Sequence, residues 1–334
     1  MKNVRTLVLL CLIAAAPVFN RTASAFEMPT LGVPLVVTGI EIANDISSSS
    51  ADRFPRTLPV FRHSAKPVVF PAPTVQALLD QSAFQGTNYV EFEQRQTNAV
   101  PGSAIRMTTP DRRDFFYSDP SKGGIVVFNH GTGVDPRRDN PPHDAVPKFE
   151  AIRDRIIEYA KSFGISTNEM EATDDGSIRL RKTDDETVAR GGAIKFISRR
   201  SVAVSRSLAG FPLLGSEDKI ELALGVSGRL LKFELRWPRA EAVRTNRLFT
   251  IPKIVDSIKG GQALADAMNQ YPSDGVSKII LKDFRIFYYV PTGSDPRVVS
   301  TNVDIVPIAS IHAVFVSKSG KTEDGALYCP VLEP

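Results

Sequence analysis

The sequence predicts an α+β protein built from tandem modules, each with one helix packed on an antiparallel sheet. Residues 219–237 alternate between apolar and polar with a period of two, which is typical of strands with one buried face. Residues 147–164 place apolar side chains at helical spacing. A helix followed by a run of strands recurs three times, and such runs favour antiparallel sheets over a doubly wound parallel sheet.

The first 25 residues have the three regions of a secretory signal peptide. Lys2 and Arg5 precede an apolar run at 7–18, and small residues occupy 23–25. We expect cleavage after position 25 and a secreted or periplasmic mature protein. No later stretch reaches the roughly 18 to 20 apolar residues of a transmembrane helix, so no membrane span is expected after cleavage. Cys11 lies inside the apolar run without a small residue before it, which disfavours lipid modification as the alternative.

Charge and cysteine content narrow the classes of function. The leader carries three of the 41 basic residues and none of the 37 acidic ones, so the remaining chain is nearly neutral. It has no basic patch with interleaved aromatic residues, and nucleic-acid binding is not predicted. Cys329 is the single cysteine beyond the leader, which excludes an intramolecular disulfide. A buried thiol is its expected role, with pairing between chains as the alternative.

The predicted elements divide the mature chain of this 334-residue protein into an arm and three modules. Residues 26–66 form an extended arm rich in Pro and Ser. The three α+β modules are expected at 67–143, 144–243 and 244–334. The middle module contains the alternating strands at 219–237.

Each module begins with its helix. In the first, a helix at 75–84 precedes strands at 88–92, 104–108, 115–118 and 125–129. In the second, a helix beginning at Pro147, a favourable first helical position, precedes strands at 178–182, 193–205 and 219–237. In the third, a helix through 254–268, weakened by Gly260-Gly261, precedes strands at 278–290, 304–316 and 326–332.

The stretch at 202–233 resembles the propeptide-type modules known as PepSY and FTP. The matching features are a turn with a small residue, glycine and proline at 209–213, the alternating strand at 220–224, and Gly228-Arg229 before the closing strand. Residues 305–331 are similar to the closing hairpin of a related module. The resemblance implies protease inhibitors, intramolecular chaperones or protein-binding domains, whose partner is another protein or peptide such as an envelope protease or sensor. No His-Glu-x-x-His motif of a zinc protease is present in the sequence.

Phe211 and Trp237 are candidate interaction residues. Both are aromatic residues next to turns, where such side chains can anchor a partner. The alternative is a place in the core, which is common for aromatic residues on the apolar face of a strand.

A second candidate site lies at 125–143, where an apolar strand ends in His130 and a glycine. This strand end resembles the oxyanion loop of α/β-hydrolases, although the Gly-x-Ser-x-Gly motif of those enzymes is absent. His130, Asp135, Asp139 and His143 are candidate ligands of a divalent transition metal such as zinc. The neighbouring prolines and arginines favour an ordinary solvated loop as the alternative.

No catalytic residue and no cofactor are predicted. The sequence favours a non-enzymatic protein-binding or protease-regulatory protein that is secreted or periplasmic. The alternative is a small hydrolase or metal-dependent enzyme centred on His130.

Overall fold

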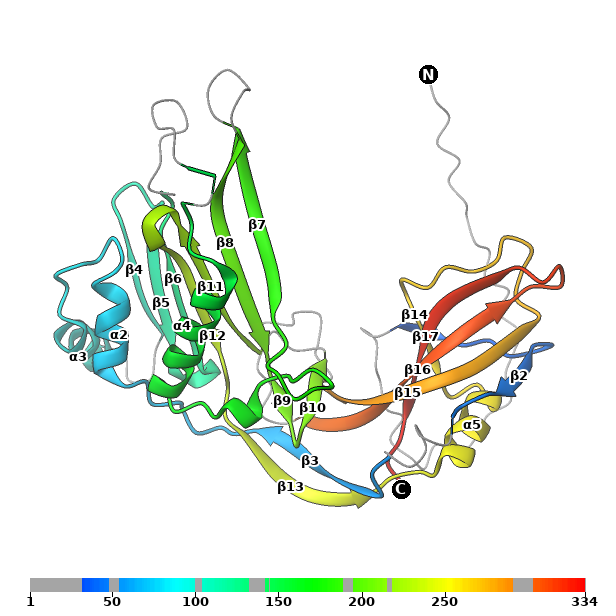
Figure 1. Ribbon diagram of the computed structural model, residues 1–334. Helices are drawn as coiled ribbons and strands as arrows, with labels where there is room; N and C mark the ends of the chain where they lie inside the picture. The colour runs from blue at the N-terminus through cyan, green and yellow to red at the C-terminus, as the bar shows by residue number, and fades with distance from the viewer. Residues whose placement is uncertain are drawn as a thin grey trace.

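The computed structural model describes residues 32–47, 54–99, 104–131, 142–143, 145–188, 195–214, 218–290 and 303–333. Within these ranges the strands form one seven-stranded and one ten-stranded sheet. Figure 1 shows the two sheets as separate lobes, bridged along the base by β3 (Thr57–His63) and β13 (Ala240–Arg247). These two bridging strands pair antiparallel with each other along their length.

The seven-stranded sheet is antiparallel throughout. Its spatial order is β4 (Ile105–Thr108), β5 (Phe115–Asp119), β6 (Gly124–Phe128), β12 (Leu230–Arg236), β11 (Lys219–Gly225), β8 (Lys195–Ser205) and β7 (Arg181–Val188). Alternate residues such as Ile220, Leu222 and Phe233 are fully buried on one face. That face packs against α2 (Ala72–Leu79), the start of α3 (Tyr89–Ala99) and α4 (Phe149–Ser162). The predicted alternation is confirmed, and the predicted helix is present but begins at Phe149 and not at Pro147.

The opposite face of this sheet carries a ladder of charges. Lys219 lies 2.9 Å from Glu221 and 3.3 Å from Glu234, and Lys232 lies 2.9 Å and 2.7 Å from the same two carboxylates. Burial alone raises the pKa of each glutamate, but the bonds and charges of the two lysines outweigh burial and hold both pKa values below the usual range. The ladder therefore stabilises the charged forms of both acids.

The ten-stranded sheet is arranged around β15 (Lys278–Tyr289). The order along its main path is β1 (Gly32–Pro34), β14 (Leu264–Asp266), β17 (Thr322–Pro330), β16 (Asp304–Val316), β15, β10 (Phe211–Leu214) and β9 (Ser207–Leu208). β2 (Glu41–Asn44) pairs parallel with the first residues of β15, and β10 pairs parallel with its last residues. β3 also pairs with the start of β16.

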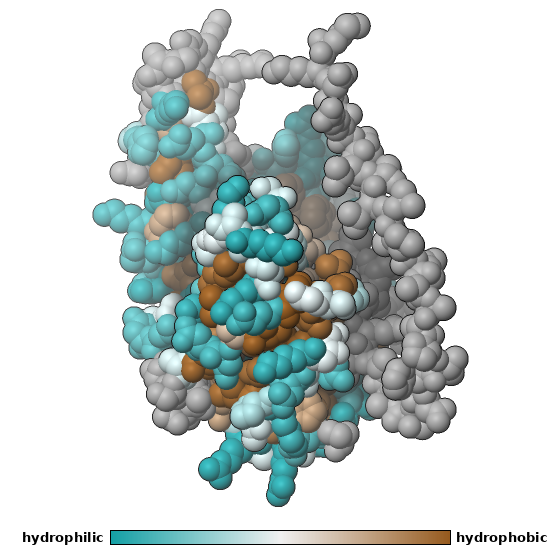
Figure 2. All heavy atoms as spheres, turned by 90° about the vertical axis from the view of Figure 1, so that its right-hand side faces the viewer, coloured by the Kyte–Doolittle hydropathy of each residue, from teal (hydrophilic) through white to brown (hydrophobic). Residues whose placement is uncertain are grey.

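Among the described residues, one helix belongs to the second lobe. α5 (Ile251–Lys259) buries Ile254, Val255 and Ile258 in the core of the ten-stranded sheet. Figure 2 faces this lobe and shows apolar side chains at the surface between hydrophilic ones.

The predicted fold class, tandem modules of one helix on a sheet, is wrong. The described residues are mostly β, and strands from 67–143 and 144–243 share one sheet, in which β6 pairs with β12. A strand at a sheet edge leaves unpaired backbone groups, and this pairing satisfies the groups of both strands. β1, β2 and β3, from the region predicted as an arm, pair with strands of the ten-stranded sheet.

Two local predictions are also wrong, and capping explains both. Residues 88–92, predicted as a strand, start α3, because the Asn88 side chain accepts a hydrogen bond from the Glu91 amide at 3.3 Å and donates one to the Glu91 carboxylate at 3.2 Å. The third helix ends at Lys259 and does not continue to 268. Gly261 has a φ of +73°, the left-handed conformation that commonly follows the last turn of a helix.

The turn between β9 and β10 contains a strained alanine. Ala209 and Gly210 form the two-residue connection and have φ values of 48° and 84°. Two consecutive positive φ values suit Asn-Gly far better than Ala-Gly. Ala209 is exposed, so its side chain gives little packing in return for the strain.

Replacing Ala209 by asparagine should raise the free energy of unfolding by about 1 kcal/mol, because asparagine tolerates the left-handed conformation. Urea denaturation followed by tryptophan fluorescence measures the change. Ala65→Asn, at another exposed alanine whose φ is not positive, is the matched control. A loss of stability in Ala209→Asn, or an equal gain in both variants, would contradict the strained turn.

Acid should remove the contribution of the charge ladder. Because the folded-state pKa values of Glu221 and Glu234 are lowered, the stabilisation is present above the unfolded pKa of about 4.3 and is lost as the pH falls through the lower folded values. Lys232→Met should therefore reduce the free energy of unfolding by about 2 kcal/mol at pH 7 and weaken its decline between pH 5 and pH 3.

Urea denaturation at a series of pH values checks this prediction. Lys318→Met removes an exposed lysine for which the structure records no ion pair, and it should leave the pH profile unchanged. If the free energy of unfolding depends on pH in the same way in the wild type and in Lys232→Met, the charge ladder does not contribute to stability as described.

Candidate functional site at the junction of the two sheets

Four connections between the described elements pass from one sheet to the other at one place, one of them through Asp218, which precedes β11. Residues 64–71 connect β3 to α2, Arg206 alone connects β8 to β9, and residues 237–239 connect β12 to β13. The crossing brings together side chains that are far apart in the sequence. It also places a cavity beside them.

Arg206 is the centre of a buried charge cluster. Its side chain is 4% exposed. Nη1 donates to the carbonyl oxygen of Pro238 and lies 3.4 Å from Oδ2 of Asp218, and Nη2 donates to Oε2 of Glu169 at 2.9 Å. Trp237 Nε1 donates to the same Glu169 oxygen at 3.1 Å, and its ring lies 5.3 Å from the guanidinium carbon. A buried guanidinium is thus held by two carboxylates, a carbonyl group and an aromatic ring.

His63, the last residue of β3, extends this cluster. It is 3% exposed, and its Nε2 lies 3.8 Å from Oδ2 of Asp218. Neither ring nitrogen of His63, nor Nε of Arg206, has a hydrogen-bond partner among the described residues. Buried polar atoms without partners are costly, so a polar group that reaches them gains free energy.

A cavity of about 730 Å³, here called the junction cavity, opens beside the cluster. Its wall combines the polar cluster residues Arg206, Glu169 and Trp237 with apolar side chains. The apolar part of the wall includes Phe61, Val68, Val69, Phe163, Ile165 and Leu208. The volume lies in the range of roughly 300–1,000 Å³ that is typical of ligand sites. Sites with this combination of surfaces are common where two structural units meet.

The junction suits binding better than catalysis. Ser207 Oγ donates to the carbonyl of Met170 at 3.1 Å and is buried, so it is not presented as a nucleophile. Arg206 is neutralised by Asp218 and Glu169, and the whole group is fixed by hydrogen bonds. Rigid polar groups beside an apolar wall give orientation and specificity to a bound molecule.

Of the two predicted interaction residues, one lines the junction cavity and the other lines a different cavity. Trp237 is 6% exposed and belongs to the core of the seven-stranded sheet while lining the junction cavity. Phe211 is half-buried and lines a smaller cavity of about 360 Å³ with Phe54 and Phe284. Their role in binding a partner stays a prediction.

The structure describes two of the four predicted metal ligands. His130 and His143 are exposed, and Asp135 and Asp139 lie outside the described residues. Over the ranges that the structure describes, no three His, Cys, Asp or Glu side chains are grouped to hold a metal ion. The metal site stays a prediction.

The predicted oxyanion loop has its first backbone donor occupied. The amide of His130 donates to Oδ1 of Asp114 at 2.6 Å, so it is not directed at a substrate oxygen. The preceding Asn129 is buried and bonds the backbone of Ala83 and Leu230. This strand end is held by structural hydrogen bonds.

Cys329 is fully buried in the ten-stranded sheet, as expected. Burial raises the pKa of its thiol to about 12. The reactive thiolate form is therefore negligible near neutral pH.

Trp237 is the one cluster residue that the sequence predicts as part of a site. Arg206 lies inside the stretch that resembles PepSY modules and His63 lies in the predicted arm, and the sequence predicts no role for either. Arg206 is visible in the sequence only as a single charged residue between two apolar strands, and this pattern does not indicate which residues it contacts.

No helix among the described residues combines the length and the apolar character needed to cross a membrane.

No family model matches the chain, and no curated protein matches it. Among solved structures it is similar to an uncharacterized protein from Eubacterium rectale, with 9% sequence identity and a TM-score of 0.39 over 86% of each chain. A similarity at this level indicates no function.

Replacing Arg206 by methionine should lower the free energy of unfolding by about 3–5 kcal/mol, because Asp218 would remain buried without its cation. Urea denaturation monitored by the fluorescence of the single tryptophan, which lies in the cluster, measures the loss.

Arg153→Met is the control for this substitution. Arg153 is 43% exposed and pairs with its neighbour Asp154, so its removal should change stability by less than about 1 kcal/mol. Equal effects of the two substitutions would show that the cluster has no special role in stability.

Proposed function

We propose that the chain is a secreted or periplasmic, non-enzymatic protein that binds an extended segment of another protein in the junction cavity. The observation that carries the proposal is the combination of an apolar wall, in which Val69 is exposed, and a fixed carboxylate in one cavity. An envelope protease or a sensor is the class of partner that the resemblance to PepSY modules favours.

The apolar wall supports this proposal because one of its valines is exposed to solvent. Val69 is 87% exposed although it is a large apolar residue, and it lies next to Val68 in the cavity wall. Phe61 and Leu208 line the same cavity. Covering such a surface with an apolar side chain of a partner removes it from water, which is favourable by about 25 cal/mol per Å².

The polar wall supplies a hydrogen-bond acceptor. Glu169 is 41% exposed, and its Oε2 is held by Arg206 and Trp237. Its other oxygen, Oε1, accepts no hydrogen bond from the described residues. A backbone N–H or an ammonium group of the partner can therefore donate to Oε1 without disturbing the cluster.

The apolar residues and Glu169 of the junction cavity together suit an extended peptide segment. An apolar side chain would lie against Val68 and Val69, and a neighbouring backbone amide would bond Glu169. Because Glu169 is already oriented, little conformational entropy is lost on binding. The hydrolase alternative has less support, because the amide of His130 is already bonded to Asp114.

Selection of displayed random peptides against the mature protein tests this function. Enriched peptides should share an apolar residue, and Val69→Asp should weaken their binding at least about tenfold, because it places a charge on the apolar wall. Fluorescence anisotropy with labelled peptides measures the affinity. Addition of the same peptides to protease assays then shows whether a protease-regulatory role is involved.

Val36→Asp is the matched control. Val36 is also exposed, at 71%, but it does not line the junction cavity, so peptide affinity should stay unchanged. If no peptide is enriched, or if both aspartate variants bind equally well, the proposed function is wrong. Ester hydrolysis that is lost in His130→Ala would favour the alternative.

A further inference from the structure

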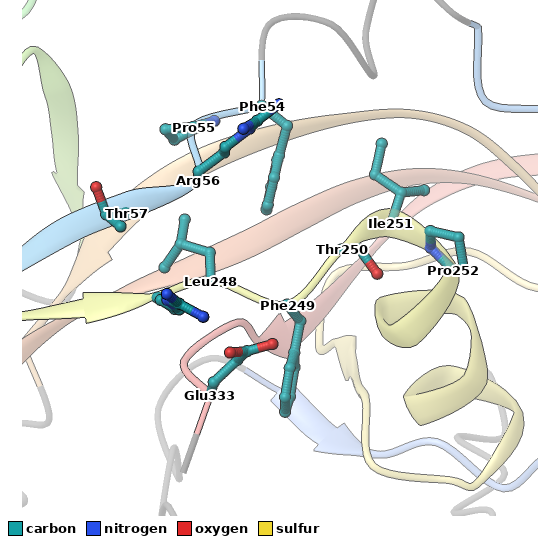
Figure 3. A pocket seen from close by; sticks show the side chains of 11 residues that line it. Phe54, Pro55, Arg56, Thr57, Leu248, Phe249, Thr250, Ile251, Pro252 and Glu333 are labelled. Atoms are coloured by element: carbon teal, nitrogen blue, oxygen red, sulfur yellow. The ribbon is translucent and has the colours of Figure 1, made fainter.

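A second cavity lies at the other end of the β3–β13 ribbon (Figure 3). Its volume is about 830 Å³, and it shares no lining residue with the junction cavity. Most of its wall is apolar and consists of Phe54, Pro55, Leu248, Phe249, Ile251 and Pro252. Figure 3 shows these side chains coming from the residues just before β3, from the connection between β13 and α5, and from the start of α5.

Backbone hydrogen bonds join the three segments that form this cavity. The amide of Leu248 donates to the carbonyl of Arg56 at 2.9 Å, and the amide of Phe249 donates to the carbonyl of Val331 at 2.7 Å. The amide of Glu333 donates to the carbonyl of Arg247 at 3.0 Å. The start of β3, the end of β13 and the C-terminal segment are therefore tied together, and the cavity is formed in the free protein.

The charges on the cavity wall are predominantly positive. Arg56 and Arg247 line it, and neither guanidinium has a hydrogen bond or an ion pair in the part of the chain that the structure describes. Glu333 is the carboxylate among the lining residues, and Lys253 neutralises it across 3.1 Å. Two arginines that pair with no carboxylate of the described residues therefore border an apolar cavity.

We propose that this cavity binds a long-chain aliphatic carboxylate. The hydrocarbon chain lies against the apolar wall, and the carboxylate pairs with one of the two arginines, which suit carboxylates by their fork of N–H donors. The apolar wall disfavours small hydrophilic anions, and the positive charge disfavours cationic amphiphiles. This activity is independent of peptide binding at the junction cavity.

Isothermal titration calorimetry with dodecanoate tests the proposal. Dodecanoate should bind with a stoichiometry of about one, and affinity should rise about fourfold for each added methylene between octanoate and dodecanoate. Dodecyltrimethylammonium, with the same chain length and the opposite charge, should not bind. The arginine that pairs with the carboxylate is identified by substitution. At least one of the variants Arg56→Gln and Arg247→Gln should weaken dodecanoate binding about tenfold.

Two control variants separate this site from other effects. Arg95→Gln removes an arginine that is 74% exposed on α3, and Val69→Asp alters the junction cavity. Both should bind dodecanoate as the wild type does. The outcome of this test therefore does not depend on the proposed function.

Three results would overturn the proposal. They are the absence of dodecanoate binding, equal binding of dodecyltrimethylammonium, and unchanged affinity in both Arg56→Gln and Arg247→Gln. Binding of a peptide with an apolar residue and a free carboxylate at its C-terminus, without binding of dodecanoate, would assign the cavity to a peptide end and would also contradict the proposal.

Discussion

The buried contacts of Arg206 with Asp218 and Glu169 are the interaction on which the arrangement of the two sheets depends. Arg206 alone separates β8 of one sheet from β9 of the other, Asp218 precedes β11, and Nη1 also bonds the carbonyl of Pro238 after β12. One side chain therefore fixes the positions at which three strands meet the junction. Because a buried charge without its partner is costly, other arrangements of these segments are strongly disfavoured.

The same cluster connects the fold with the candidate function. It holds Glu169 and Trp237 in the wall of the junction cavity, which also contains apolar residues such as Val69. The β3–β13 ribbon then links this cavity to the second one. β3 runs from Thr57, in the wall of the second cavity, to His63 in the charge cluster, so the two cavities lie at opposite ends of one strand.

Local patterns in the sequence predicted local structure well. The alternation at 219–237 and the helical spacing at 147–164 depend on neighbouring residues, and both elements are present. The strand pairing was not predictable in this way, because β6 and β12 are about a hundred residues apart and nothing in either strand specifies the other. The charge cluster was missed for the same reason, since the contacts of Arg206 lie 12, 32 and 37 residues away. The prediction of a strand at 88–92 is wrong because the Asn88 side chain caps the start of a helix there.

A double-mutant cycle of Arg206→Met and Asp218→Leu tests most directly whether the buried cluster holds the junction together. The free energy of unfolding of the wild type, both single variants and the double variant gives the coupling energy between the two side chains. The structure predicts a coupling of about 2 kcal/mol or more, with the double variant losing less stability than the two single losses combined. A coupling near zero would contradict the central role of this interaction.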